Sequence, residues 1–344
     1  MGFKKLLVIV GVVLGLLVLV LVKKTAQKKY LAKQETAPLT TEFELIKDLP
    51  ETFISGVVVY KGDDEKNKMV LVKNSQGLWI LESKYGIKAR KPSVDNLLKE
   101  LKGLKGEVRA ESKDLFADFQ IEDSKALHIL IEAGTGNIIN HLVVSFLKPD
   151  WNKTFVRQDK SEKVVLVNKD ILSLFNLYSK EAKLNDTYFA DLKLFTFEAK
   201  QIQKIELISD KEQLIFKKSQ PEGSANPVWN FEPALAQGEE IDTSKVDELL
   251  RNISNIYAKE ILDPSLSTYG FDAPSLKITL QDLEAKKAAQ MEIGQYLESE
   301  KSHYLRVIPA NLVFKVSESY IKNLKKERVS FLKPKEVPKE VKKN

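Results

Sequence analysis

The most apolar stretch of the chain lies near its start, where every residue from Leu6 to Val22 is apolar or glycine. At about 1.5 Å per residue, a helix over this stretch, with lysines reaching to both interfaces, can cross a slightly thinned bilayer core of ~30 Å. The pattern predicts a transmembrane anchor over 1–27. A cleaved signal peptide is the alternative, because Lys4 and Lys5 form a plausible n-region, but no small-residue cleavage site follows Val22.

Two later segments place aliphatic residues three and four positions apart, which is the spacing of one helical face. The first follows Ser93, predicted here to be its N-cap, and the second follows Asp242. The aliphatic positions are Val94, Leu97, Leu98, Leu101 and Leu104 in the first segment, and Val246, Leu249, Leu250, Ile253 and Ile256 in the second. A further helix is predicted over 170–178.

Short stretches rich in β-branched and aromatic residues surround these helices and predict strands. They cover 55–60, 69–73, 78–82, 127–131, 141–146, 155–158 and 164–167, and later 204–208, 213–217 and 228–232. The polar residues 61–68 are predicted as the loop of a hairpin. The order of strands, helix, strands and helix predicts an α+β fold with largely antiparallel sheets.

The order of these elements repeats along the chain. Trp79 and Trp229 are 150 residues apart, Val94 and Val246 are 152 apart, and Arg157 precedes its counterpart Arg306 by 149. Separated features that keep the same offset predict duplication of a folding unit, because the period is far longer than that of a solenoid repeat.

We therefore predict an N-terminal transmembrane helix followed by two tandem copies of an antiparallel-sheet-plus-helices unit. The boundaries predicted along the chain are an anchor over 1–27, a stem over 28–41, a first α+β unit over 42–183, a second over 184–332, and a disordered basic tail over 333–344.

The net charge of +6 is unevenly distributed. Residues 1–33 hold seven lysines and no acidic residue, and the tail from Lys333 holds five lysines against two glutamates, so the remaining body carries −4. That sign is wrong for a protein that binds a phosphate backbone, and nucleic acid is therefore excluded as a partner. Cysteine is absent, which excludes disulfides and thiolate chemistry.

The turn Tyr269–Pro274 (Tyr-Gly-Phe-Asp-Ala-Pro), the tryptophan strand and the aliphatic helix resemble the DUF4340 family over nearly the whole chain. The first copy departs from this pattern, since Asp118–Glu122 contains neither the glycine nor the proline. The resemblance implies a bacterial protein of the inner membrane with a single membrane helix and a repeated extracytoplasmic body. It also implies a gene beside a gliding-motility-like ABC exporter permease. No reaction or ligand is known for the family.

The lysines beside the predicted anchor favour the opposite orientation, with the body in the cytoplasm. Lys23, Lys24, Lys28 and Lys29 outnumber Lys4 and Lys5, and the positive-inside count alone would place the body in the cytoplasm. Both orientations stay open, and the resemblance favours the extracytoplasmic one.

Candidate chemistry is sparse. The histidines His128, His141 and His303 lack the close spacing of a helix-borne zinc site. The acidic run Asp63–Glu65 lacks the pattern of a calcium loop, and Gly134–Gly136 lacks that of a phosphate loop, so both are predicted as hairpin turns. We predict no catalytic, cofactor-binding or metal site and no cofactor.

Two pairs of residues recur at matching positions in the two copies. Trp79 and Trp229 are predicted to be core residues, with a shared ligand surface as the alternative. Arg157 and Arg306 are expected to pair with acids or to end a strand.

The function expected from these observations is that of a non-enzymatic, membrane-anchored accessory or scaffold protein that binds another envelope protein, in an ABC transport assembly. The alternative is an envelope glycan or small-ligand binding module with its site between the two copies, because ligands favour domain interfaces. An enzyme is the third hypothesis, and no constellation of residues supports it.

Overall fold

The computed structural model describes residues 42–46, 51–62, 64–134, 136–220, 227–232 and 234–334. The predicted anchor (1–27), the stem (28–41) and most of the predicted tail (333–344) lie outside the described residues. Within the described part of the chain, no helix is both long and apolar enough to span a membrane.

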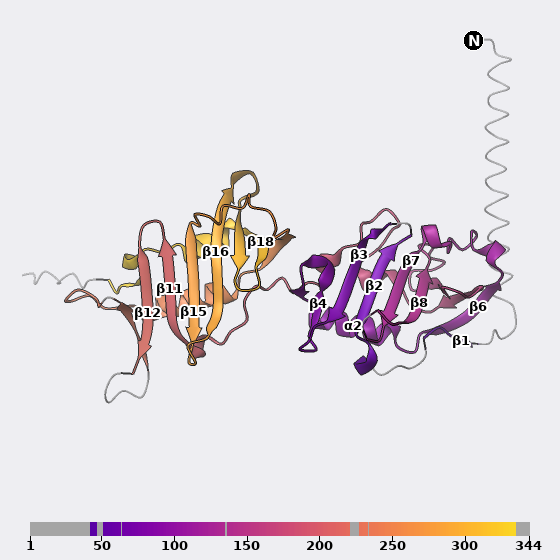
Figure 1. Ribbon diagram of the computed structural model, residues 1–344, viewed down its shortest axis with the longest axis horizontal. Coiled ribbons are helices and arrows are strands. Elements are labelled where there is room, and N and C mark those ends of the chain that lie inside the picture. Colours follow the sequence, from indigo (N-terminus) through magenta and orange to yellow (C-terminus); the bar gives the residue numbers. More distant parts are fainter. Residues whose placement is uncertain are drawn as a thin grey trace, which may run out of the picture. The chain divides into compact units, whose positions relative to one another are not determined.

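In the described residues, two antiparallel sheets and three α-helices make up the fold (Figure 1). The first sheet has ten strands: β1 (Glu42–Glu44), β2 (Gly56–Lys61), β3 (Asp64–Lys73), β4 (Trp79–Leu81), β5 (Ile87–Lys88), β6 (Lys105–Glu111), β7 (Leu127–Glu132), β8 (Ile138–Val144), β9 (Thr154–Gln158) and β10 (Lys163–Val167). Their order is β1-β6-β10-β9-β8-β7-β2-β3-β4-β5.

The second sheet has eight strands: β11 (Ile202–Ser209), β12 (Gln213–Ser219), β13 (Val228–Glu232), β14 (Ala258–Leu262), β15 (Leu276–Asp282), β16 (Lys287–Leu297), β17 (Ser302–Val307) and β18 (Leu312–Ser317). Their order is β13-β12-β11-β15-β16-β17-β18-β14. Read in the matching direction, this is the order of β4-β3-β2-β7-β8-β9-β10-β6 in the first sheet. The largely antiparallel α+β architecture predicted from the sequence is confirmed.

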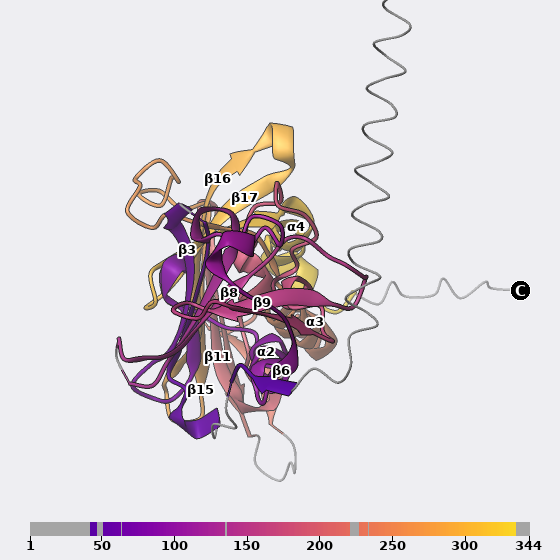
Figure 2. The ribbon, with the colours of Figure 1, turned by 90° about the vertical axis from the view of Figure 1, so that its right-hand side faces the viewer.

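Both predicted amphipathic helices are present. Helix α2 (Lys91–Leu101) and helix α3 (Thr243–Ser254), both labelled in Figure 2, each connect the strands before them to a strand at the other side of their sheet. Their aliphatic positions, from Val94 to Leu101 and from Val246 to Ile253, are buried. Burying four such side chains per helix stabilises each helix far more than its backbone propensity does, at roughly 1.5–3 kcal/mol per side chain.

The two helices begin differently. The Asp242 side chain accepts a hydrogen bond of 3.0 Å from the backbone N–H of Ser244 and so caps α3. The predicted cap of α2 is wrong, since Ser93 lies inside the first turn, where its hydroxyl accepts from Arg90 Nε at 2.7 Å. The Ser93 hydroxyl therefore accepts from the Arg90 side chain and not from a backbone N–H of the first turn, as an N-cap would.

Two further predictions are corrected. Residues 64–68 belong to β3 and not to a hairpin loop, because backbone pairing carries the strand into a segment whose side chains are exposed. The helix predicted over 170–178 is only a 3₁₀ turn, Leu172–Phe175, which ends at Asn176 in a left-handed conformation (φ +55°). The second copy does end with a helix, α4 (Glu318–Leu324), which contacts α3, β17 and β18.

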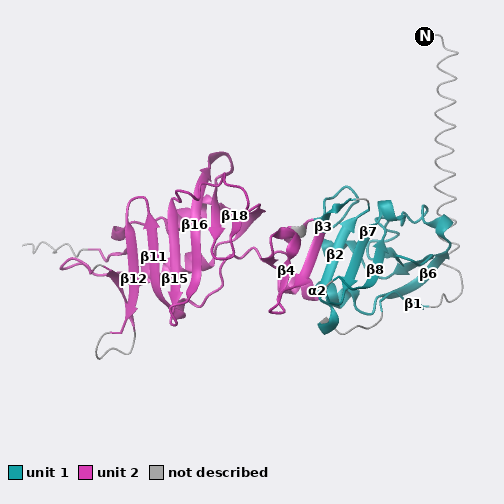
Figure 3. Cartoon of the chain, viewed as in Figure 1, with its two compact units in different colours: residues 1–68, 96–184 teal, residues 69–95, 185–344 magenta. Residues whose placement is uncertain are grey.

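The chain forms two compact units (Figure 3). The first contains the described residues up to 68 together with 96–184, and the second contains 69–95 together with 185–344 up to the last described residue. Residues 69–95 hold the end of β3, β4 and β5, and in the second unit Ala89 pairs with Ala190. The unit boundaries predicted at 183 and 184 remain a prediction.

Candidate functional site

Two of the three histidines meet inside the first sheet, although thirteen residues separate them. His128 lies on β7 and His141 on β8, as diagonal cross-strand neighbours, and His128 Nδ1 is 2.9 Å from His141 Nε2. Tyr60 lies directly opposite His128 on β2, and the two rings stack with centroids 4.6 Å apart. The sequence offered no signal for this contact, because spacing along the chain does not report cross-strand adjacency.

The hydrogen bonds fix the tautomers of the two neutral rings. His128 Nε2 is 2.8 Å from the carbonyl of Asp123 and must donate to it, so His128 Nδ1 accepts from His141 Nε2. This leaves His141 Nδ1 as an acceptor, 3.7 Å from a carboxylate oxygen of Asp159. Burial lowers the pKa of His141, and His128 and Arg157 lower it further, while Asp159 opposes the shift. Both ring nitrogens of His128 and Nε2 of His141 are therefore paired within the protein.

Arg157 completes this network. Its side chain is only 2% exposed, lies over the Phe116 ring, and forms an ion pair with Asp123. It donates to the carbonyl of Ile121 at 3.1 Å and to that of Asp159 at 2.5 Å. A buried guanidinium needs this number of acceptors, because an unpaired buried charge costs several kcal/mol.

Its counterpart Arg306 has the same kind of partners in the second unit. Arg306 Nε donates to Glu292 at 3.0 Å, and the guanidinium lies over the Phe271 ring. The expectation that both arginines pair with acids is confirmed, although Arg306 is 30% exposed and Arg157 is not.

The tryptophan pair is mainly structural. Trp229 on β13 is buried, as predicted for a core residue, and Trp79 on β4 is half-buried. A lysine ammonium lies over each ring, from Lys218 at 4.8 Å and from Lys73 at 5.2 Å. Neither ring is a free platform for a ligand.

The glycine motif is a backbone turn as predicted, whereas the described residues of the acidic run lie in a strand and not in a turn. Ala133 N–H donates to the carbonyl of Asn137 at 2.9 Å, and Gly134 and Gly136 both have positive φ, so this segment is the predicted β7–β8 hairpin. Asp64 and Glu65 begin β3. Across the described ranges, no group of three histidine, aspartate or glutamate side chains is placed to hold a metal ion.

The residues best placed to meet a partner are aromatic ones that the sequence analysis did not single out. Trp151, in the loop between β8 and β9, is 80% exposed, and Tyr178, after the 3₁₀ turn Leu172–Phe175, is 70% exposed. Folding normally hides such rings, since a buried Trp or Tyr removes 150–250 Å² from water, a range typical of these side chains.

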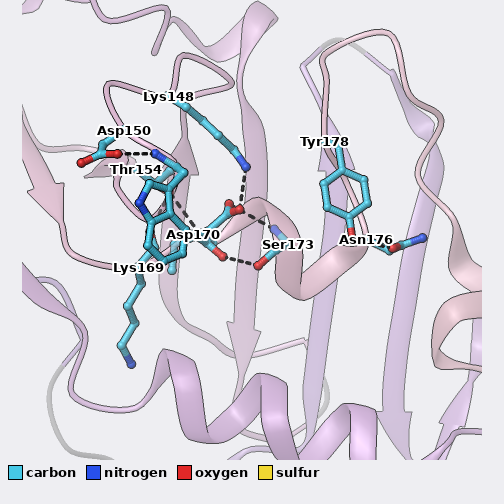
Figure 4. Close-up of polar contacts among 10 residues, drawn as sticks. Lys148, Asp150, Thr154, Lys169, Asp170, Ser173, Asn176 and Tyr178 are labelled. Carbon is cyan, nitrogen blue, oxygen red and sulfur yellow. Dashed lines mark hydrogen bonds and ion pairs between the residues drawn. The ribbon is translucent and has the colours of Figure 1, made fainter.

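The segments that carry these rings are held in place by polar contacts (Figure 4). Lys148 Nζ forms an ion pair of 2.6 Å with Asp170, and the second carboxylate oxygen of Asp170 accepts from Ser173 N–H at 3.3 Å. The buried Thr154 hydroxyl donates to the carbonyl of Lys169 at 2.7 Å and accepts from Ile171 N–H at 3.1 Å. The loop with Trp151 and the turn before Tyr178 are thus tied to each other.

Each aromatic residue also has a local anchor. The backbone N–H of Trp151 donates to the Asp150 carboxylate at 2.7 Å, and the Tyr178 hydroxyl donates to Asn176 Oδ1 at 3.0 Å. At the base of the loop, Ser145 Oγ donates to the carbonyl of Phe119 at 2.6 Å and accepts from Leu147 N–H. The backbone is fixed while both rings stay in solvent. We call Trp151 and Tyr178, with their Lys148–Asp170 frame, the aromatic surface.

The fold and these side chains define a two-sheet α+β protein in which Arg157 and Arg306 are each paired with an acidic residue and two exposed aromatic residues lie on loops held by polar contacts. The chain belongs to the family described as a domain of unknown function, DUF4340, whose model matches residues 79–267 and 241–340. No curated protein and no solved structure matches the chain.

Proposed function

We propose that this chain is a non-enzymatic accessory protein of the cell envelope, held in the membrane by residues 1–27 and binding another protein through the aromatic surface of its first unit. The partner proposed is a permease or associated subunit of an ABC transport assembly. The observation that carries the proposal is the pair of exposed rings, Trp151 and Tyr178, on polar-bonded loops.

A rigid exposed aromatic side chain is the usual centre of a protein interface. Trp and Tyr are enriched among the residues that dominate binding energy, because they bury a large area at a small entropic cost. The ion pair and the Thr154 bonds fix the loops before binding, which lowers the ordering cost further.

The duplicated body of the proposal is supported by the equal strand order of the two sheets. Residues at matching positions also agree. Phe119 and Phe155 form a ring pair at 4.8 Å, and Tyr269 and Tyr304, at offsets of 150 and 149 residues, form one at 4.7 Å.

A crosslinking experiment tests the contact. The chain has no cysteine, so Trp151→Cys and Tyr178→Cys each give a single site for a thiol-reactive photocrosslinker. We expect irradiation of cells that express these full-length variants to join the chain to a transporter subunit, identified by mass spectrometry. Leu283→Cys is the matched control, since Leu283 is 70% exposed in the turn between β15 and β16.

Two outcomes would count against the proposal. Equal crosslinking from Leu283→Cys would mean that the aromatic surface is not selective. Products that contain only this chain, or no product at all from either aromatic position, would remove the aromatic surface as the contact site.

A further inference from the structure

The second unit contains a pocket of about 410 Å³ that the aromatic surface does not involve. Four separate segments line it: the turn at Gly270 and Asp272, the end of β16 at Gln295 and Tyr296, β17 at His303, and the chain after α4 at Lys325. Its volume lies within the range of ~300–1,000 Å³ that small-ligand sites occupy.

A β-bulge opens this place in the sheet. The register between β16 and β17 shifts between Ile293 and Tyr296, and Gln295 N–H turns to donate to the carbonyl of Tyr269 at 2.8 Å. Gly294 makes this approach possible, because a Cβ there would lie 2.1 Å from the Tyr269 oxygen. Bulges redirect side chains away from the regular pleat and occur often beside functional sites.

His303 lies at the wall of the pocket and is 8% exposed. Its Nδ1 is buried and has no hydrogen-bond partner in the described part of the chain. Burial lowers the pKa of His303, as does Lys325, so the neutral ring, with one donor and one acceptor nitrogen, prevails at neutral pH. A buried polar atom left unpaired destabilises the fold, and a hydrogen bond from a ligand would offset part of that cost.

The charges around the pocket balance. Lys325 supplies a cation and Asp272 an anion at the wall. Glu318, which acts on both Tyr296 and His303, is itself paired with Lys322 at 2.8 Å. This mixture disfavours a multiply charged ligand and suits a neutral one that both donates and accepts hydrogen bonds. The Tyr296 ring, 38% exposed and 4.8 Å from the His303 ring, adds an apolar face.

We infer that this pocket binds a saccharide ring, whose hydroxyl groups pair with His303, Lys325 and Asp272 while one face of the ring lies against Tyr296. Such a ligand is neutral, carries donors and acceptors at its rim, and has an apolar face. The inference goes beyond the proposed protein contact and does not depend on it, because it concerns the second unit alone.

The test observes the His303 ring directly. The chain has only three histidines, so ¹⁵N-histidine labelling of the full-length protein gives few ring signals, and His303→Gln assigns the one of interest. The protein is purified in a detergent without a sugar head group. Methyl glucoside is the monosaccharide probe, cellotetraose is the glycan probe, and inorganic phosphate is the anionic control.

We expect millimolar saccharide to shift the His303 ring signals and to leave those of His128 and His141 in place. Tyr296→Ala should weaken binding about five- to tenfold, as loss of a ring contact predicts. Tyr257→Ala, a change at a similarly exposed tyrosine outside the pocket, should leave it unchanged. Tighter binding of cellotetraose than of methyl glucoside would indicate that the bound saccharide ring belongs to a glycan. Equal binding of the two probes would indicate a free monosaccharide.

The inference is overturned if neither saccharide moves the His303 signals, if phosphate alone moves them, or if Tyr296→Ala and Tyr257→Ala bind equally well. None of these results bears on the aromatic surface, whose crosslinking is measured separately.

Discussion

At the scale of single residues, His141 shows how burial sets the charge state of a side chain. Its Nε2 donates to His128, and its Nδ1 faces Asp159 at 3.7 Å. Desolvation exceeds the attraction of that carboxylate, so the pKa of His141 lies below its ordinary value of 6.5. The folded protein therefore binds a proton at this site less readily than the unfolded chain does.

This difference predicts a pH dependence of stability. The stabilisation is complete above pH 6.5, the unfolded value, and is lost as the pH falls through the lower folded-state pKa. The free energy of unfolding, measured by urea denaturation between about pH 7.5 and about pH 5, should thus decrease more steeply for the native chain than for His141→Gln. Tyr257→Phe should keep the native slope, and a His141→Gln slope equal to the native one would refute the assignment.

The histidine network also shows what sequence reasoning could not reach. His128 and His141 were each recognised as strand residues, but their contact depends on the register of β7 against β8. Arg157 and Arg306 were found because they recur at a fixed offset, and their acidic partners were expected only as a class. Register and burial, which decide such contacts, are properties of the folded sheet.

At the scale of elements, strong periodicity was a reliable guide and weak periodicity was not. Four of the five predicted aliphatic positions lie in each of α2 and α3, because apolar residues at helical spacing leave little choice, while Leu104 and Ile256 follow the helix ends. The strands β6 and β14 were missed, since Lys105–Glu111 and Ala258–Leu262 are short and rich in charge. They form strands because neighbouring strands pair with them, a contact that their own sequences do not reveal.

The turn before β7 and the turn before β15 differ at one informative position. Gln120 has φ +50° and is exposed, whereas Gly270, 150 residues later, has φ +76°. A left-handed conformation costs about 1–2 kcal/mol for a residue with a Cβ and little for glycine. The first copy retains the backbone of the turn without the residue that best adopts it.

We therefore predict that Gln120→Gly raises the free energy of unfolding by about 0.5–1 kcal/mol. The converse change, Gly270→Ala, should lower it by at least as much, because the new Cβ would also lie 3.2 Å from Gln295 N. Urea denaturation of both variants measures the two effects. A loss of stability in Gln120→Gly would show that this exposed side chain makes a contribution that outweighs the backbone strain.

At the scale of the whole molecule, the side of the membrane on which the body lies decides which partners it can meet. Our proposal places the body outside the cytoplasm. Ser299 lies in an exposed 3₁₀ turn, Glu298–Glu300, and the chain has no other thiol, so Ser299→Cys reports its own side alone. We expect an impermeant maleimide to label this variant in intact cells.

The control for this prediction is labelling after lysis, which must succeed in either case. Labelling only after lysis would place the body in the cytoplasm, as the lysines Lys23, Lys24, Lys28 and Lys29 would suggest by themselves. It would also exclude an envelope partner on the outer side of the membrane.

The division of the chain into units has a practical consequence for anyone who wishes to dissect it. The second unit takes residues 69–95 from the middle of the first, so neither unit is one continuous stretch of sequence. A fragment cut to begin at residue 185 would keep all eight strands of the second sheet and would lose Ala89, the partner of the Ala190 backbone. Residues 69–95 also supply β4 and β5 to the first sheet, so moving them to that fragment would leave the first sheet two strands shorter. The gene segment that encodes residues 185–334 is therefore the simplest one from which to express the second sheet.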